Sequence, residues 1–441
     1  MNVYRLTSSE FLYLIIFPKV SFFIMKKFYI LTFFTELLVL VSTFCTYKFT
    51  IIFLRPESFS EYILSRRILS FLQPFLLLGM GIAIPRFVAY EHAKNRFKKR
   101  DSYFISALSI LTCVSIIFLL TLNFFKSKIA FLLYGNSNYY NFLNAIFIML
   151  IGLVLHISCY SYLRGKLNMI KANILQLITM GIIPPFAFIG SSTTLEVLYK
   201  TGIGWCFLSF VTVFVILRQL HWNKNDFFNS TKQILLYGIQ RVPGAIGLSA
   251  LFTLPATFTA HLSGIREAGF VAFGISVLTL LRTIFAPAGL ILLPKISQLA
   301  AQKNYSLLKA YIKNTLKVTI LLTLIIVIIL EIFAKQILIL YLGQNFPELI
   351  FIFRTIVIGS FAYSIYISMR SFIDAIHIKA INTLNIIVSL LIFLILSIST
   401  LVFAKNYLYI LFYFLITLFF LGFLTLLQLR KIYRGNVDNK H

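Results

Sequence analysis

Apolar residues fill most of this chain in long runs, and a short polar or basic stretch separates each run from the next. A helix that crosses a bilayer needs about 20 apolar residues, because its backbone N–H and C=O groups must all be bonded within the segment. Twelve runs predict such helices, near residues 28–54, 62–89, 102–124, 140–163, 169–190, 194–220, 231–262, 268–299, 309–334, 347–374, 379–402 and 405–428. The chain is therefore predicted to be an all-α integral membrane protein.

The composition supports the same class and excludes others. Hydrophobic residues make up 59% of the chain and charged residues 12%, so the chain lacks the mixed charged surface of a soluble globule. The net charge of +27 does not indicate nucleic-acid binding, because the basic residues lie in short clusters between apolar runs. The four cysteines lie within apolar runs without metal-ligand spacing, and neither a metal nor a cofactor is expected.

The positions of Lys and Arg predict the orientation in the membrane, because short basic loops stay on the cytoplasmic side. Most of the 40 basic residues lie in the two terminal segments and in every second connection. Both termini are therefore expected in the cytoplasm.

Matching segments recur at a nearly constant distance along the chain. YSYLRG at 160–165 resembles YISMRS at 366–371, and AIPRFVAYEHAKN at 83–95 resembles LLPKISQLAAQKN at 292–304. The offset of 206 to 209 residues between two sets of six spans predicts a parallel repeat with a pseudo-twofold axis along the membrane normal. The predicted division is an N-terminal segment 1–27, a first lobe 28–220, a linker 221–230, a second lobe 231–428 and a C-terminal tail 429–441.

Five segments, in order, resemble the recurring segments of bacterial polysaccharide flippases: RPESFSEY at 55–62, LLLGMGIAIPRFVAYEHAK at 76–94, YLRGKLNMIKAN at 162–173, LLYGIQRVPG at 235–244 and GIREAGFVAFG at 264–274. The resemblance covers about residues 26–430. That family moves lipid-linked oligosaccharides and belongs to the multidrug/oligosaccharidyl-lipid/polysaccharide exporter superfamily. The resemblance implies two six-helix bundles of MATE type around a central cavity, in the cytoplasmic (inner) membrane of a bacterium.

Charged and polar residues inside the spans are the candidates for function, because a charge within the bilayer usually faces a cavity or a partner. Cations outnumber carboxylates there, which suits an anionic cargo, and the planar fork of arginine grips phosphate oxygens well. Helical stripes of these residues lie on the first two spans of each half, which by the resemblance line the cavity. The predicted cavity residues are Arg282, Arg241, Arg66, Arg67, Lys48, Arg354, Gln73 and Thr279.

Other interpretations of these residues stay open. Arg66, Arg67, Lys48 and Arg354 lie close enough to the outer ends of their spans to extend to the headgroups, and Arg241 is placed to fix the backbone beside a proline. Glu36 is interpreted either as a proton or sodium site or, preferably, as the partner of a nearby arginine. His156, His261 and His377 show no metal-ligand pattern and are expected to be packed or interfacial residues.

The predicted function is the transfer of a polyprenyl-diphosphate-linked oligosaccharide, an O-antigen or capsule repeat unit, from the inner to the outer leaflet by alternating access. Anionic membrane lipids, and the polymerase and chain-length proteins of the same pathway, are the other expected partners. No nucleic acid is expected.

Three other functions remain possible. A multidrug exporter of the same superfamily would need an acidic cavity, and a lipid II flippase resembles a design with fourteen helices. A membrane O-antigen polymerase would need a large outer loop, and catalysis in general would need an acidic cluster that the chain does not contain. The protein is therefore expected to be a transporter and not an enzyme.

Overall fold

The computed structural model describes residues 18–221, 224–302, 305–376, 380–403 and 405–433. Parts of the predicted terminal segments 1–27 and 429–441 lie outside these ranges. The first lobe contains α2 (Pro18–Phe53), α3 (Pro56–Leu77), α4 (Met80–Ala93), α5 (Phe97–Tyr134), α6 (Tyr140–Gly165), α7 (Met169–Gln176), the π-helical η2 (Leu177–Ile182), α8 (Ile183–Phe186) and α9 (Thr194–Leu217), with a 3-10 turn η1 (Ser137–Tyr139) between α5 and α6. After α10 (Lys224–Ile239), the second lobe contains α11 (Val242–Ser263), α12 (Ile265–Ala301), α13 (Tyr305–Ile332), α14 (Ala334–Leu342), α15 (Pro347–Ile376), α16 (Ile381–Phe403) and α17 (Tyr407–Tyr433).

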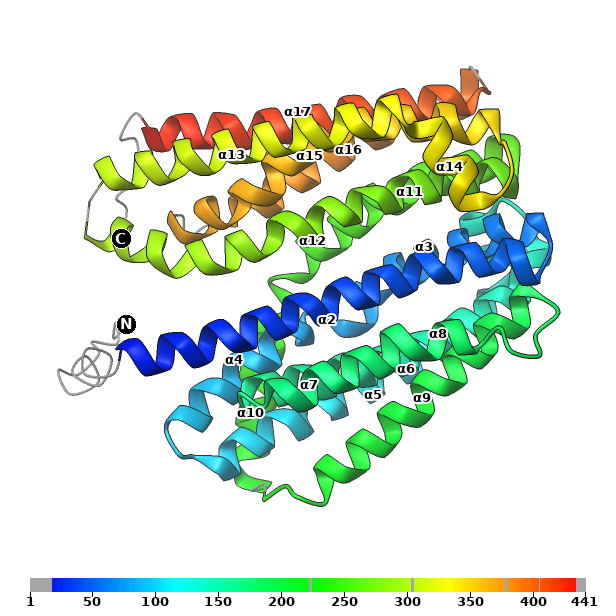
Figure 1. Cartoon of the computed structure of the whole chain (residues 1–441). Helices are drawn as coiled ribbons and strands as arrows, with labels where there is room; N and C mark the ends of the chain where they lie inside the picture. The colour runs from blue at the N-terminus through cyan, green and yellow to red at the C-terminus, as the bar shows by residue number, and fades with distance from the viewer. Residues whose placement is uncertain (1–17, 222–223, 303–304, 377–379, 404, 434–441) are drawn as a thin grey trace.

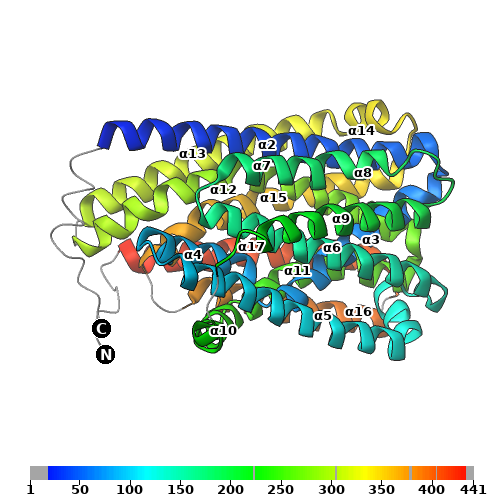
Figure 2. The ribbon, with the colours of Figure 1, turned by 90° about the horizontal axis from the view of Figure 1, so that it is seen from below.

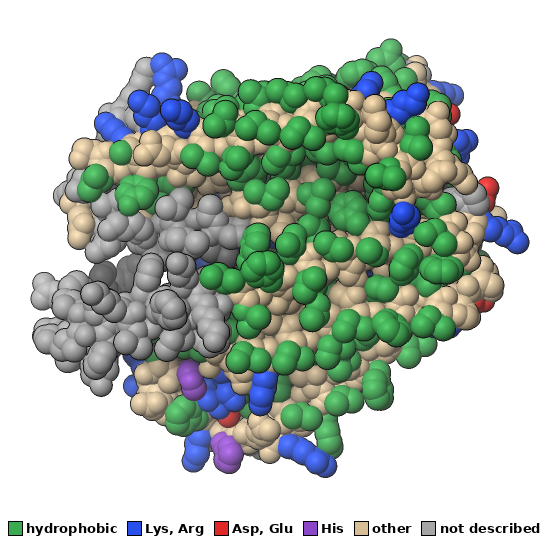
Figure 3. Space-filling model, viewed as in Figure 1, with side chains coloured by type: hydrophobic (Ala, Val, Ile, Leu, Met, Phe, Trp, Pro, Cys, Tyr) green, Lys and Arg blue, Asp and Glu red, His purple; other side chains and the backbone are tan. Residues whose placement is uncertain are grey.

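The helices have the lengths and surfaces of a membrane protein. In the described part of the chain, 11 helices are long and apolar enough to cross a bilayer, and the bent pair α3 and α4 brings the total to 12. On the face shown in Figure 3, hydrophobic side chains cover the middle of the surface, and most Lys and Arg side chains lie toward its edges. The predicted fold class, an all-α membrane protein with two bundles, is confirmed.

The two lobes repeat the same packing arrangement. In the first lobe α6 packs against α9, and α2 packs against α7 and η2. In the second lobe α15 packs against α17, and α11 packs against α16. Figure 1 shows the two lobes side by side with their helices running in the same general direction. We call the end where α2 begins and α17 ends the termini end, and the end where α2 passes into α3 the far end.

The second span is broken in its middle. Helices α3 and α4 meet at an angle of 48°, and the break is formed by Leu78 and Gly79, which have φ values of 43° and 75°. The N–H of Leu78 donates to the carbonyl of Pro74, so the proline that predicted a kink lies one turn before it. A Cβ atom at Gly79 would lie 2.4 Å from the carbonyl oxygen of Gly238 at the end of α10. The broken span is therefore in backbone contact with the helix that joins the lobes.

The predicted seventh span, 231–262, begins too early. Residues up to Ile239 belong to α10, which lies across the other helices and is seen nearly end-on in Figure 2. Helix α10 packs against α4 and α5 of the first lobe, where Thr231 donates to Ser106 at 2.9 Å. The membrane helix α11 starts at Val242, and Pro243 occupies its first turn, where a missing N–H costs no hydrogen bond.

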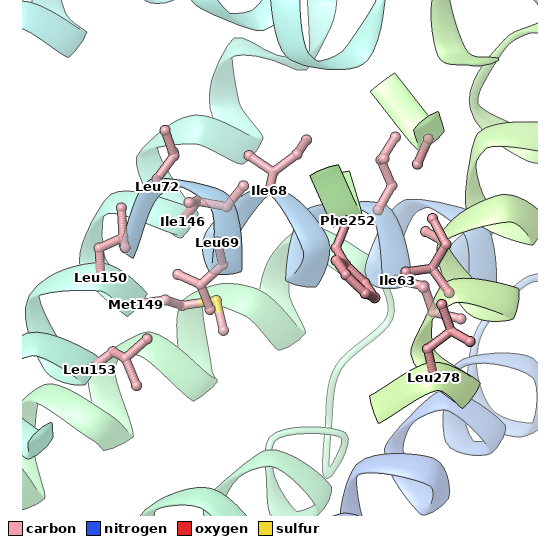
Figure 4. Packing of buried hydrophobic residues seen from close by; sticks show 14 of the residues in the cluster. Ile63, Ile68, Leu69, Leu72, Ile146, Met149, Leu150, Leu153, Phe252 and Leu278 are labelled. Carbon is pink, nitrogen blue, oxygen red and sulfur yellow. The ribbon is translucent and has the colours of Figure 1, made fainter. Parts of the chain in front are cut away.

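The lobes meet near the far end, where α3 packs against α11 and α12. Figure 4 shows Leu69 and Leu72 of α3 turned toward α6 of their own lobe, whereas Ile63 lies near Phe252 and Leu278 of the other lobe. Toward the termini end α2 and α12 diverge (Figure 1).

Residues at the repeat distance touch each other at this contact. The Ser60 hydroxyl donates to the carbonyl of Arg266 at 2.9 Å, and the two residues are 206 positions apart. A Cβ atom at Gly269 would lie only 2.3 Å from the Cα of Ser60. Equivalent residues of two repeats meet only at the axis that relates them, so the pseudo-twofold axis passes between α3 and α12.

Candidate functional site

The centre of the molecule contains a polar cluster to which both lobes contribute. Arg282 lies near the middle of α12 with an exposed side chain, although Leu281 and Phe285 beside it are buried. Its charge interacts electrostatically with Glu36 on α2 of the first lobe and with Tyr363 on α15 of the second. These interactions with groups of both lobes support an orientation of Arg282 toward the space between the lobes.

Glu36 is held from its own lobe by neutral groups. The Tyr160 hydroxyl donates to its carboxylate at 3.4 Å, and the Gln176 amide donates at 3.3 Å. Two arginines, Arg164 of the first lobe and Arg282 of the second, interact with it at longer range. The ion pairs found among the described residues do not include Glu36. The interpretation of Glu36 as the partner of a nearby arginine stays a prediction, with these longer-range interactions in its favour.

A pocket of about 270 Å³ lies between α4, α6, the end of α7 and η2, and its residues Tyr160 and Gln176 donate to Glu36. We call it the first-lobe pocket; it is lined by Gly81, Pro85, Leu153, His156, Ile157, Tyr160, Ser161, Arg164, Gln176 and Met180. Its polar residues come from α6 and from Gln176 at the end of α7, directly before the π-helical η2, and π-helical turns are frequent at functional sites. The guanidinium of Arg164 lies 5.3 Å from the centre of the Tyr160 ring.

The neighbouring arginines of α3 point to different lobes. Arg66 packs within the first lobe, with its guanidinium 5.0 Å from the ring centre of Trp205 on α9. Arg67 crosses to the second lobe, where it donates to the hydroxyl of Ser276 at 2.7 Å and to the carbonyl of Ala272 at 3.2 Å. Of these two arginines, Arg67 is the one that touches the other lobe, and it does so where α3 packs against α12.

Three other predicted cavity residues have other surroundings than Arg282 and Glu36. Lys48 lines a separate, otherwise apolar pocket of about 410 Å³ between α2, α12 and α14. Arg354 is exposed and lies 3.8 Å from Glu331 of α13. Arg241 is the residue before α11, and its guanidinium lies 3.6 Å from the ring centre of Tyr237 on α10. Arg241 therefore lies between α10 and α11. The prediction that it lies within a continuous span 231–262 is wrong.

The remaining predicted residues are polar groups on α3 and α12. Thr279 donates to the carbonyl of Ser276 and so stabilises its own helix near Arg282. Gln73 is half-buried one position before Pro74. Among the described residues, neither side chain forms a hydrogen bond or an ion pair with a charged group.

Sequence reasoning missed Arg164, Tyr160, His156 and Gln176 as members of one site. The signal for the first two was present, because Tyr160 and Arg164 are the residues that YSYLRG shares with YISMRS. Arg164 falls just beyond the predicted span 140–163, in the basic connection that follows it, whereas in the structure it belongs to the last turn of α6. His156 had been taken for a packing residue, and it is 1% exposed, but it also lines the pocket.

Known proteins resemble this chain in structure but not closely in sequence. No model of a known protein family matches the chain, and no curated protein sequence matches it. A multidrug resistance transporter of the MATE family of the MOP superfamily superposes in its inward-facing conformation with a TM-score of 0.73 and 13% identity, over 93% of this chain and 96% of that chain. The outward-facing conformation of such a transporter gives a TM-score of 0.63 and 13% identity, over 94% and 97% of the two chains.

A third similar structure is a MOP superfamily transporter from Pyrococcus furiosus Vc1, described as having a binding pocket of reverse polarity that suggests a different function. Its TM-score is 0.66 at 12% identity, over 92% of this chain and 94% of that chain. The chain therefore has the fold of the MATE transporters of the MOP superfamily.

Proposed function

We propose that this protein is a flippase that moves a polyprenyl-diphosphate-linked oligosaccharide across the cytoplasmic membrane. The observation that carries the proposal is the position of Arg282, a mid-span cation that faces the space between the lobes. An anionic headgroup needs such a cation, because an unpaired charge in the membrane interior costs several kcal/mol or more. The resemblance of five segments to polysaccharide flippases supports the same cargo.

Alternating access supplies the mechanism. The lobes touch at the far end through α3 and α12, whereas α2 and α12 diverge toward the termini end. The headgroup enters from the termini end and meets Arg282 while its polyprenyl tail stays in the bilayer. The lobes then rock about the pseudo-twofold axis, the contacts of Ser60 and Arg67 open, and the sugar leaves at the far end.

Export of cationic drugs is the second candidate function. Glu36 favours it, because this carboxylate lies at the lobe boundary, and two of the structures with the same fold are described as multidrug resistance transporters. The charge of the cargo separates the two functions. Arg282 must attract an anionic cargo and must repel a cationic one.

Reconstitution into sealed vesicles tests the proposal directly. A fluorescent polyprenyl-diphosphate sugar is placed in both leaflets, and the fraction that an impermeant quencher reaches is followed with and without protein. The expected result is protein-dependent equilibration of this lipid between the leaflets, with no protein-dependent uptake of a cationic dye. Uptake of the dye without movement of the lipid would favour the drug exporter and reject the flippase.

A further inference from the structure

We propose that the first-lobe pocket is the subsite for the sugar ring next to the diphosphate, and that Arg164 at its edge holds a phosphate oxygen. This inference rests on the proposed function and names the part of the cargo that the pocket takes. The pocket volume of about 270 Å³ is far more than the roughly 10–15 Å³ that holds one water molecule. It is thus large enough for a small polar ring.

The hydrogen bonds determine what kind of group His156 accepts. The Gln176 amide nitrogen donates to the Glu36 carboxylate at 3.3 Å, so its oxygen is the atom that faces His156 at 2.8 Å. That oxygen only accepts, so the Nε2 of His156 carries the proton and its Nδ1 holds a lone pair. Nδ1 is buried and has no hydrogen-bond partner among the described residues. An unpaired buried acceptor is costly, and a ligand hydroxyl would supply the missing donor.

The aromatic residues of the pocket wall suit a sugar ring. The Tyr160 and His156 rings are nearly parallel, with an interplanar angle of 15° and a centroid distance of 5.9 Å. Aromatic rings of this kind give a flat apolar surface next to polar groups, which is the combination found in small-molecule sites. Arg164 adds a cation beside Tyr160, and its planar fork suits the oxygens of an adjoining phosphate.

The second lobe supplies an internal comparison. Arg370 is the repeat equivalent of Arg164, 206 positions later, but its Nε lies 3.5 Å from the carboxylate of Asp374. At the same offset Asn168 stands where Asp374 stands in the second lobe, and His156 corresponds to Ala362. The second lobe therefore lacks the histidine and pairs its arginine internally. The recognition of the sugar is thus assigned to the first lobe alone.

Binding measurements on the full chain in lipid nanodiscs test this assignment. The probes are polyprenyl diphosphate without sugar and the same lipid carrying one sugar, chosen from glucose, galactose, N-acetylglucosamine and N-acetylgalactosamine. The wild type is expected to bind at least one sugar-bearing lipid more tightly than the sugarless lipid. His156→Leu is expected to weaken binding of that lipid about tenfold, the effect of one lost hydrogen bond, and to leave the sugarless lipid unchanged.

Two further variants complete the test. Arg164→Gln should weaken both lipids about tenfold because it removes the phosphate contact. Lys171→Gln, which removes an exposed charge of α7 outside the pocket, should weaken neither. Gly81→Val serves as a second pocket variant if His156→Leu does not fold, because a Cβ atom at Gly81 meets only Ile157 at an ordinary 3.4 Å.

The outcomes separate the two proposals. Equal affinity of the wild type for sugar-bearing and sugarless lipids, or full affinity of the pocket variants for the sugar-bearing lipid, would overturn the sugar subsite and leave the flippase standing. If the wild type binds no diphosphate lipid, the proposed function falls and the subsite falls with it.

Discussion

The arginines Arg66 and Arg67 are neighbours in the sequence but have different surroundings, which separates them as candidates for cargo binding. Successive residues are about 100° apart around a helix, so Arg66 and Arg67 cannot face the same side. Arg66 stacks on Trp205 inside the first lobe, and Arg67 bonds to Ser276 across the lobe boundary. Among the described residues neither Arg67 nor Arg282 forms an ion pair, but Arg67 is held by its hydrogen bonds to the second lobe, whereas Arg282 is exposed. At the residue scale it is therefore the best target for mutation.

Arg282→Gln is expected to slow the movement of the diphosphate lipid at least about tenfold, because a charge-assisted hydrogen bond to phosphate is worth roughly 1.5–3 kcal/mol. The rate is measured in proteoliposomes with the quenching assay, and membrane insertion is checked by the elution profile of the purified protein. Lys335→Gln, which removes an exposed cation of α14 near the far end, should keep the wild-type rate. A wild-type rate for Arg282→Gln would remove this residue from the site.

At the scale of elements, the joint between α3, α4 and α10 connects the lobes. The break at Leu78 and Gly79 brings the backbone of the second span against Gly238 of α10. The Tyr237 ring next to it lies between two guanidinium groups, that of Arg86 from α4 at 4.3 Å and that of Arg241 before α11 at 3.6 Å. These contacts join the start of α11 to the broken span of the first lobe.

Gly79→Ala is expected to destabilise this joint. Its φ of 75° costs a non-glycine residue about 1–3 kcal/mol, and the added Cβ would lie 2.4 Å from the carbonyl oxygen of Gly238. Gly343 is a matched control, because it has a φ of 73° but nothing within 4 Å of its added Cβ. Thermal unfolding in detergent should show a clearly larger drop in midpoint for Gly79→Ala than for Gly343→Ala. Equal drops would mean that the contact with α10 adds nothing to the backbone strain.

At the scale of the whole molecule, α3 and α12 join the two lobes near the far end, and we expect this contact to hold that end closed. The closest approach is at Gly269, where the α12 backbone lies directly against Ser60. Arg67 and Ser276 add a polar contact farther along the same pair of helices. Both contacts lie near the pseudo-twofold axis. A separation of α3 from α12 at these points would therefore move one lobe as a whole relative to the other.

Gly269→Ala is expected to push the lobes apart at the far end, because its Cβ would lie 2.3 Å from the Cα of Ser60. Distances between spin labels on Ser137→Cys and Gln344→Cys, in a background without the four native cysteines, should lengthen. Gly274→Ala is the matched control on the same helix, because its Cβ would crowd the flexible end of Ile356 and otherwise meet Ile352 at an ordinary 3.7 Å, both within the second lobe. An unchanged distance distribution for Gly269→Ala would show that this contact does not hold the far end closed.

The sequence by itself determined the class of the protein, the positions of most membrane helices and the division into two similar halves. These properties depend on the length of apolar runs and on repeated segments, which are read along a single chain. It missed the start of the seventh span, because the apolar run continues through Leu235 and Leu236 although α10 turns across the bundle there. The contact of α10 with α4 and α5 decides that turn, and it is tertiary.

Only the tertiary structure decided which polar residues form a site. A run of residues shows that a charge lies within a span, but the rotation of each helix depends on the partners against which it packs. Arg66, Arg67 and Arg354 looked alike in the sequence, and their neighbours Trp205, Ser276 and Glu331 come from other helices. The first-lobe pocket likewise needs α4, α6, α7 and η2 together. A site assembled from distant segments becomes visible only when packing has brought them side by side.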